Sequence, residues 1–208
     1  MIQACLLAMI AGYADTVGFI RYEAFAGLMT GNTILVGIEV ATTQGARAGF
    51  HAGIMGVFLV GVMLAQALLR VGTPVWAALC VAATLLVLCG LVEKSTAALI
   101  LPLAMGLQNS AANRFNGVAL NTVFITGNIQ KVGEGLLAWI WPSSDANAQP
   151  GFAIFGLVWF AYAVGAGFGA VAERVLAQPL LLPAALLPFI MVTQREVDRM
   201  RRMLKRFR

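Results

Sequence analysis

Apolar residues fill most of the chain in long stretches, separated by short groups of charged and turn-forming residues. Three stretches carry no charge at all, residues 71–92, 146–172 and 175–194. Each supplies the roughly 20 residues that a helix needs to cross a bilayer. Cutting the chain at charges and turn formers gives eight apolar segments, which are residues 2–21, 25–42, 48–70, 74–92, 96–114, 118–141, 152–173 and 179–193. No period-two alternation appears, so the pattern predicts helices rather than membrane strands.

Composition strengthens this prediction. Hydrophobic residues make up 60% and charged residues 11% of the 208 positions, whereas charged residues are about a quarter of a soluble domain. We therefore expect an all-α polytopic transmembrane bundle of six to eight apolar segments, with residues 1–194 forming one domain. The first apolar run lacks the basic residues that open a signal peptide, so we expect it to be the first helix of the mature protein.

Two Thr-Gly-Asn triplets stand out inside apolar segments, at residues 30–32 and 126–128. A small-residue segment with a polar pair precedes each of them, "AGYADTVGF" at 11–19 and "AMGLQNSAAN" at 104–113. A glycine-rich segment follows each of them, "GVFLVGVMLAQALLR" at 56–70 and "WFAYAVGAGFGAVAER" at 159–174. The same order of three features in both parts of the chain predicts an internal duplication.

The duplication sets residues about 1–92 against residues about 96–194. With Gly12 aligned to Gly106, Asp15 falls on Asn109. Two arrangements stay open. If all eight segments cross the bilayer, the halves run parallel; if the triplet segments enter and leave on one side, each half crosses three times and the halves are inverted, as in many secondary transporters.

Asp15 is the strongest single candidate for a functional residue. An ionisable group inside a membrane segment costs several kcal/mol unless it faces protein, water or a partner. A coupling group for a proton or cation is one reading of Asp15, and a packing lock near the interface or paired with an arginine is the other. Its counterpart Asn109 lies beside Gln108 and near Asn113, so the second segment is polar but neutral.

The triplets also have two interpretations. Glycine permits a helix break, and threonine and asparagine can point hydrogen-bonding groups at a ligand. Alternatively, Gly27-x-x-x-Gly31 is a small-xxx-small motif that packs helices. On the first interpretation, the expected binding residues for a substrate or ion are Asp15, Thr30, Gly31, Asn32, Gln108, Asn109, Asn113, Thr126, Gly127 and Asn128.

Other patterns favour structural roles. Gly165, Gly167 and Gly169 lack the spacing and the preceding strand of a dinucleotide loop, so tight helix packing is expected there. Lys131 and Glu134 are three residues apart, which suits an ion pair on one helical face.

Positive charge gathers at the C-terminal end. Seven of the 14 basic residues lie in the last 14 positions, and the tail 195–208 carries the whole net charge of +5. The positive-inside bias places this tail in the cytoplasm. Apolar residues at helical spacing predict an amphipathic helix on anionic lipid headgroups. A nucleic-acid partner is not expected.

An enzyme is not expected either. His51 is the only histidine, so paired-histidine and histidine-rich metal chemistry lack their residues. An aspartyl dyad needs two acids in membrane helices, and Asp15 alone clearly qualifies. No serine lies in a G-x-S-x-G setting. Cys5, Cys80 and Cys89 lie in apolar segments without metal-type spacing, and no cofactor or metal is expected.

The motifs as a set resemble a known family. "AGYADTVGF" followed by "AGLMTGNTILVG" and then "AMGLQNSAANRFNGVALNTVFITGN" is similar to the YoaK-like family of bacterial polytopic membrane proteins, a domain of unknown function (1275). The resemblance spans about residues 6–175 and implies a multi-pass protein of the bacterial inner membrane. It implies no substrate.

The function expected from the residues is transport of a small molecule or an ion, through a polar site between two related halves. Duplicated polar breaks in corresponding positions motivate this expectation. The alternative is a non-transporting membrane scaffold or partner subunit, in which the glycines and amides only pack helices. The sequence leaves self-association into a homo-oligomer open.

Overall fold

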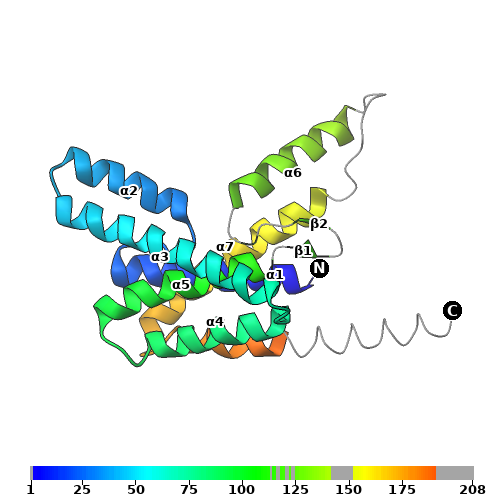
Figure 1. Ribbon diagram of the computed structural model, residues 1–208. Helices are drawn as coiled ribbons and strands as arrows, with labels where there is room; N and C mark the ends of the chain where they lie inside the picture. The colour runs from blue at the N-terminus through cyan, green and yellow to red at the C-terminus, as the bar shows by residue number, and fades with distance from the viewer. Residues whose placement is uncertain are drawn as a thin grey trace.

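The computed structural model describes residues 2–112, 114–115, 118–119, 122, 125–141 and 152–190. Asn113 and the basic tail 195–208 therefore lie outside the described residues. The helices are α1 (Ile2–Tyr22), α2 (Met29–Ala41), α3 (Gly45–Arg70), α4 (Val75–Cys89), α5 (Lys94–Ala111), α6 (Ile125–Ile140) and α7 (Phe152–Val175), followed by a helix over Leu181–Ile190. A short ladder pairs β1 (Arg114–Phe115) with β2 (Val118–Ala119). The predicted all-helical fold class is confirmed (Figure 1).

Three of the described helices are long and apolar enough to cross a membrane, namely α1, α3 and α7. They contain 21, 26 and 24 residues, and a helix rises about 1.5 Å per residue. The apolar helices α2, α4 and Leu181–Ile190 are shorter. The length and composition of these three helices therefore support a membrane protein.

Two helix pairs form the centre of the fold. α1 packs along α7, and α3 packs along α5. α4 lies on α5, while α2 and α6 each pack mainly against the helix that follows them, α3 and α7. In Figure 1 the α2–α3 hairpin lies on one side of the molecule and α6 with α7 on another. The core is rich in alanine and leucine from α1, α4 and α5, which lets these helices approach closely.

The α1–α7 crossing depends on two glycines. A methyl group at Gly12 would lie 2.1 Å from the carbonyl oxygen of Tyr162, and a methyl group at Gly165 would lie 2.0 Å from the carbonyl oxygen of Met9. Each helix therefore presses its backbone against a glycine of the other. Only a residue without Cβ permits this approach.

The α3–α5 crossing is built in the same way. A methyl group at Gly61 would lie 2.3 Å from the carbonyl oxygen of Leu103, and one at Gly106 would lie 2.2 Å from the carbonyl oxygen of Phe58. The two central helix pairs thus share one kind of contact, in which a glycine meets a backbone carbonyl.

The glycine run in α7 behaves as a packing motif, as expected. A methyl group at Gly169 would lie 2.7 Å from the carbonyl oxygen of Tyr13, so Gly169 joins Gly165 on the face toward α1. Gly167 meets nothing within 4 Å. Residues spaced by four lie on one helical face, whereas a residue two positions away points elsewhere.

The triplets do not break helices. Thr30 to Asn32 lie in the first turn of α2, and Thr126 to Asn128 lie in the first turn of α6. The break before α2 falls upstream, at residues 23–28, which are not helical. Gly27 lies in that segment, so the proposed Gly27-x-x-x-Gly31 helix-packing motif is wrong. Gly31 instead faces the Phe25 ring, which a methyl group would meet at 2.7 Å.

Candidate functional site

Residues 23–28 join α1 to α2 without helical structure, and we call them the connector. The backbone groups of a non-helical segment must find partners elsewhere, because an unpaired buried amide or carbonyl costs as much as a lost hydrogen bond. In the connector, side chains from α1, α2 and α3 supply these partners. The candidate site is built around this segment.

Asp15 binds the connector from α1. The side chain is buried, and its Oδ1 accepts hydrogen bonds from the amides of Gly27 at 2.6 Å and Leu28 at 3.0 Å. Its Oδ2 accepts a hydrogen bond from the hydroxyl of Tyr162 in α7 at 2.6 Å. All three partners donate, so this arrangement suits an ionised carboxylate, which can only accept.

Among the described residues no arginine pairs with Asp15, although such a pair is one of the two expectations for it. The arginine at the end of α1, Arg21, binds Glu173 of α7 instead, with Nε at 2.6 and 2.8 Å from the two carboxylate oxygens. Nη2 of Arg21 also donates to the carbonyl of Ala177 at 3.1 Å. This pair fixes the end of α1 on α7 and leaves Asp15 with neutral donors.

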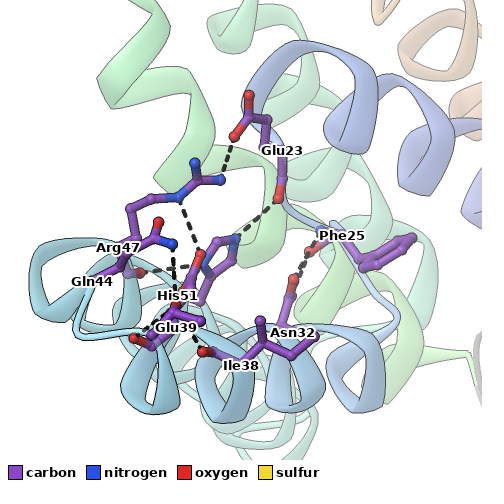
Figure 2. Close-up of polar contacts among 9 residues, drawn as sticks. Glu23, Phe25, Asn32, Ile38, Glu39, Gln44, Arg47 and His51 are labelled. Carbon is purple, nitrogen blue, oxygen red and sulfur yellow. Dashed lines mark hydrogen bonds and ion pairs between the residues drawn. The ribbon is translucent and has the colours of Figure 1, made fainter.

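Asn32 holds the connector from α2. The side chain has no exposed surface. Its Nδ2 donates to the carbonyl oxygen of Phe25 at 2.8 Å, and its Oδ1 accepts from the amide of Phe25 at 2.9 Å (Figure 2). One amide side chain thus satisfies both backbone groups of Phe25, as a neighbouring strand would. Of the other triplet members, Thr30 is exposed and Gly31 makes room for Phe25.

This geometry predicts different effects inside one triplet. Replacing Asn32 by leucine keeps the volume but leaves both buried backbone groups of Phe25 unpaired, which should lower the free energy of unfolding by about 2 kcal/mol. Replacing the exposed Thr30 by alanine should change it by no more than about 0.5 kcal/mol. Thermal unfolding of both purified variants in detergent measures the difference, and equal stabilities would contradict the assigned role of Asn32.

The candidate residues of α5 lie elsewhere along α1. Gln108 is 1% exposed, and its Nε2 donates to the carbonyl of Leu7 at 3.2 Å. Its Oε1 is buried without a hydrogen-bond partner among the described residues. Asn109 is buried beside it. Leu7 precedes Asp15 by eight residues, about 12 Å along the helix, so Gln108 and Asp15 face different levels of α1.

The second triplet repeats the burial pattern of the first at its threonine and its asparagine. Asn128 is 3% exposed, while Thr126 and Gly127 are exposed. The structure therefore brings Asp15, Gly31 and Asn32 together around the connector and places Gln108 and Asn109 at another level of α1. It does not join the candidate residues into a single site, and Asn113 is among the residues left undescribed.

An ionic cluster beside the connector is not among the sites predicted from the sequence. Glu39 of α2 is buried, with Oε1 at 3.2 Å from Nε of Arg47 and Oε2 at 2.8 Å from Nδ1 of His51. Arg47 also pairs with Glu23 of the connector (Figure 2). An acid inside the apolar segment 25–42 was the available signal for Glu39, by the same rule that singled out Asp15.

Tyr162 is the other functional candidate that the sequence did not reveal. It lies 147 positions from Asp15, and an isolated tyrosine in an apolar helix carries no signal of its own. Within the described ranges, no group of three histidine, cysteine or acidic side chains is placed to hold a metal ion.

Comparisons with known proteins bear on the family and not on the chemistry. No curated protein and no solved structure matches the chain. A family described as protein of unknown function (DUF1275), to which the YoaK-like proteins belong, matches residues 3–193. That range includes Asp15, both triplets and, apart from the first residue of α1, every helix described above. The chain therefore belongs to the DUF1275 family.

Proposed function

We propose that this protein transports a small molecule or an ion across the bacterial inner membrane, and that Asp15 is its proton- or cation-coupling residue. The observation that carries the proposal is the buried Asp15 carboxylate in α1. It is bound by donors only, from a non-helical segment and from α7. A buried ionisable group in a membrane helix is the usual mark of a transport pathway.

The carboxylate links protonation to structure. A protonated Asp15 has to donate one hydrogen bond, and the groups around it are the amides of Gly27 and Leu28 and the Tyr162 hydroxyl. The two amides cannot accept a hydrogen bond. The Tyr162 hydroxyl can accept it, and Oδ1 then binds the two amides as a neutral acceptor, which is weaker than a carboxylate. Loading a proton on Asp15 therefore weakens its hold on the connector, which is how a bound ion can drive a conformational step.

Two related halves are part of the proposal. Gly12 faces the carbonyl of Tyr162, which lies three residues before Gly165, and Gly165 faces the carbonyl of Met9, three residues before Gly12. In the other crossing, Gly61 and Gly106 each likewise face the carbonyl three residues before the other glycine. This supports a duplication in which α1 corresponds to α5 and α3 to α7, and in which each half supplies one helix to each crossing.

When the two crossings are aligned on these glycines, they differ in chemistry. Asp15 follows Gly12 by three residues as Asn109 follows Gly106, and Tyr162 precedes Gly165 by three as Phe58 precedes Gly61. The acid and tyrosine of the α1–α7 crossing thus correspond to an amide and a phenyl ring at the α3–α5 crossing. The first crossing carries an acid, whereas α5 supplies amides that can only bind by hydrogen bonds, as Gln108 is able to do through its Oε1, which has no hydrogen-bond partner among the described residues.

We further propose a multi-pass arrangement with the C-terminus in the cytoplasm and the basic tail on anionic headgroups. The 13 residues of α2 rise only about 20 Å, against a hydrocarbon core of about 30 Å. This favours the inverted arrangement, in which the triplet segments enter and leave on one side.

Proton flux in proteoliposomes tests the proposal. A potassium diffusion potential set with valinomycin drives protons, and a pH-sensitive dye inside the vesicles reports their entry. We expect wild type to exceed protein-free vesicles and Asp15→Asn to fall to their level, because an amide does not titrate. Glu134→Gln is the matched control, since Glu134 is exposed on α6 and pairs with Lys131 at 2.8 Å.

The alternative function, a protein that does not transport, predicts a different proton flux. A scaffold or partner subunit would show no flux above protein-free vesicles in any variant. Equal flux in wild type and Asp15→Asn would instead exclude Asp15 as the coupling residue.

A further inference from the structure

The ionic cluster beside the connector consists of Glu23, Glu39, Arg47 and His51 (Figure 2). Glu23 belongs to the connector, Glu39 to α2, and Arg47 and His51 to α3. His51 is 1% exposed and Glu39 is 5% exposed, whereas Arg47 and Glu23 reach the surface. Three segments of the chain thus meet at one buried imidazole.

Both ring nitrogens of His51 face oxygen acceptors. Nδ1 lies 2.8 Å from Oε2 of Glu39 and 3.1 Å from the carbonyl oxygen of Arg47. Nε2 lies 3.0 Å from the carbonyl oxygen of Glu23. A neutral imidazole carries one N–H, so beside an ionised Glu39 one nitrogen would set its lone pair against an oxygen lone pair. With Glu39 ionised, only the doubly protonated ring satisfies both contacts.

The charges of the cluster agree with this. Two carboxylates are balanced by the guanidinium of Arg47 and the imidazolium of His51, so the protonated cluster is neutral. Without the proton, Arg47 at 3.2 Å is the one cation of the cluster left beside the buried Glu39, and the cluster carries one negative charge. A buried charge that loses a partner is strongly unfavourable, so proton loss from His51 destabilises this arrangement.

The cluster has a route to water. A cavity of about 320 Å³ is lined by Tyr22, Glu23, Ala46, Arg47, Phe50 and His51. A neighbouring cavity of about 640 Å³ is lined in part by Arg21, Glu23, Glu93 and Lys94. The charged groups that face the cluster from α1 and from the start of α5 are therefore Arg21, Glu93 and Lys94. Protons can reach the cluster from the end of the molecule where the connector lies.

We propose that His51 and Glu39 form a second proton-binding site, which ties the connector to α3 when a proton is bound. The tie is the hydrogen bond from Nε2 of His51 to the carbonyl oxygen of Glu23. When the proton leaves to water, Nδ1 keeps the remaining N–H for Glu39, and Nε2 no longer donates to the connector.

This inference rests on the proposed function in one respect, because the connector is the element that Asp15 also holds. The two sites respond to protons in opposite ways. Asp15 binds the amides of Gly27 and Leu28 as a carboxylate, whereas His51 binds the Glu23 carbonyl as an imidazolium. The connector is held at both ends only while the proton is on His51 and absent from Asp15, and proton loss from His51 with proton gain at Asp15 frees both ends.

Nitrogen NMR of the single histidine tests the protonation state directly. With ¹⁵N-labelled histidine and the protein in lipid nanodiscs, His51 is the sole signal because the chain has no other histidine. We expect protons on both ring nitrogens at neutral pH in wild type and in the Glu134→Gln control. Glu39→Gln should shift the ring to one proton at the same pH. A singly protonated ring in wild type throughout about pH 5 to 8 would overturn the proposal.

Hydrogen exchange of the connector amides tests the tie. At fixed pH, His51→Gln should raise exchange of residues 23–28 about tenfold, the value of one hydrogen bond, while Glu134→Gln leaves it unchanged. Glu39→Gln retains the imidazole and should give the same rise if the first variant folds poorly. Unchanged exchange in both variants would refute the tie. Neither readout needs transport, so loss of the transport proposal in the flux assay would leave this result standing.

Discussion

Replacing Gly165 by alanine should lower the free energy of unfolding by on the order of 3 kcal/mol, the upper range for overpacking a close interface. The added methyl group would lie 2.0 Å from the carbonyl oxygen of Met9 and 2.6 Å from its Cα. Both neighbours are backbone atoms of α1, so a side-chain rotation cannot relieve the clash. α1 and α7 would have to separate along the crossing that forms half of the core.

Gly167→Ala is the matched control, two residues away in the same helix. Nothing lies within 4 Å of a methyl group there, and alanine has a higher helix propensity than glycine by about 1 kcal/mol. This variant should therefore be as stable as wild type or slightly more stable. Thermal unfolding of both in one detergent gives the comparison, and equal losses would contradict the packing of α1 on α7.

We expect the same loss of stability at the crossing of α3 and α5. Gly106→Ala should destabilise to a similar degree, because its methyl group would lie 2.2 Å from the carbonyl oxygen of Phe58. Gly133→Ala, on the open face of α6, serves as its control. A large loss at one crossing and none at the other would argue against halves that pack alike.

The helices could be predicted from the sequence because a helix that crosses a membrane requires a long apolar run. Charged residues and turn formers bound all eight segments, and each described helix lies largely within its segment. Asp15 and Asn32 were also found, because a polar group in an apolar run is costly enough to need a reason. What the pattern could not supply was the partner of each group, since partners depend on how the helices cross.

The connector illustrates this limit. Residues 25–28 are small or apolar, so the pattern predicts them as the start of the segment 25–42. The backbone of the connector lies outside a helix because Asp15, Asn32 and His51 offer it hydrogen bonds from three different helices. Asn32 was expected to face a ligand or another helix, and it satisfies Phe25 instead. Such tertiary satisfaction of the backbone leaves no periodic trace in the sequence.

The connector also explains how the charged Asp15 is tolerated inside this core. A carboxylate in a low-dielectric interior needs compensating donors. Asp15 obtains two of them from a segment that cannot satisfy its own amides. The connector and the acid therefore each supply what the other lacks, and the charge and the break in the helix stabilise one another.

Replacing Asp15 by leucine should accordingly lower the free energy of unfolding by about 4 kcal/mol, since three donors lose a charged acceptor at once. The amides of Gly27 and Leu28 and the Tyr162 hydroxyl would be left without their partner. Asp15→Asn should cost much less, because its amide oxygen can still accept from both backbone amides. Chemical or thermal unfolding in detergent distinguishes the two variants.

Tyr162→Phe completes a double-mutant cycle with Asp15→Asn. The bond from the Tyr162 hydroxyl to the carboxylate is charge-assisted, so we expect a coupling energy of about 1.5 kcal/mol or more. The double variant carries asparagine and phenylalanine, the residues that Asn109 and Phe58 supply at the corresponding positions of the α3–α5 crossing. It should therefore be more stable than the sum of the single losses predicts. Strict additivity would mean that the Asp15–Tyr162 hydrogen bond does not stabilise the fold, and that the carboxylate is held by the connector alone.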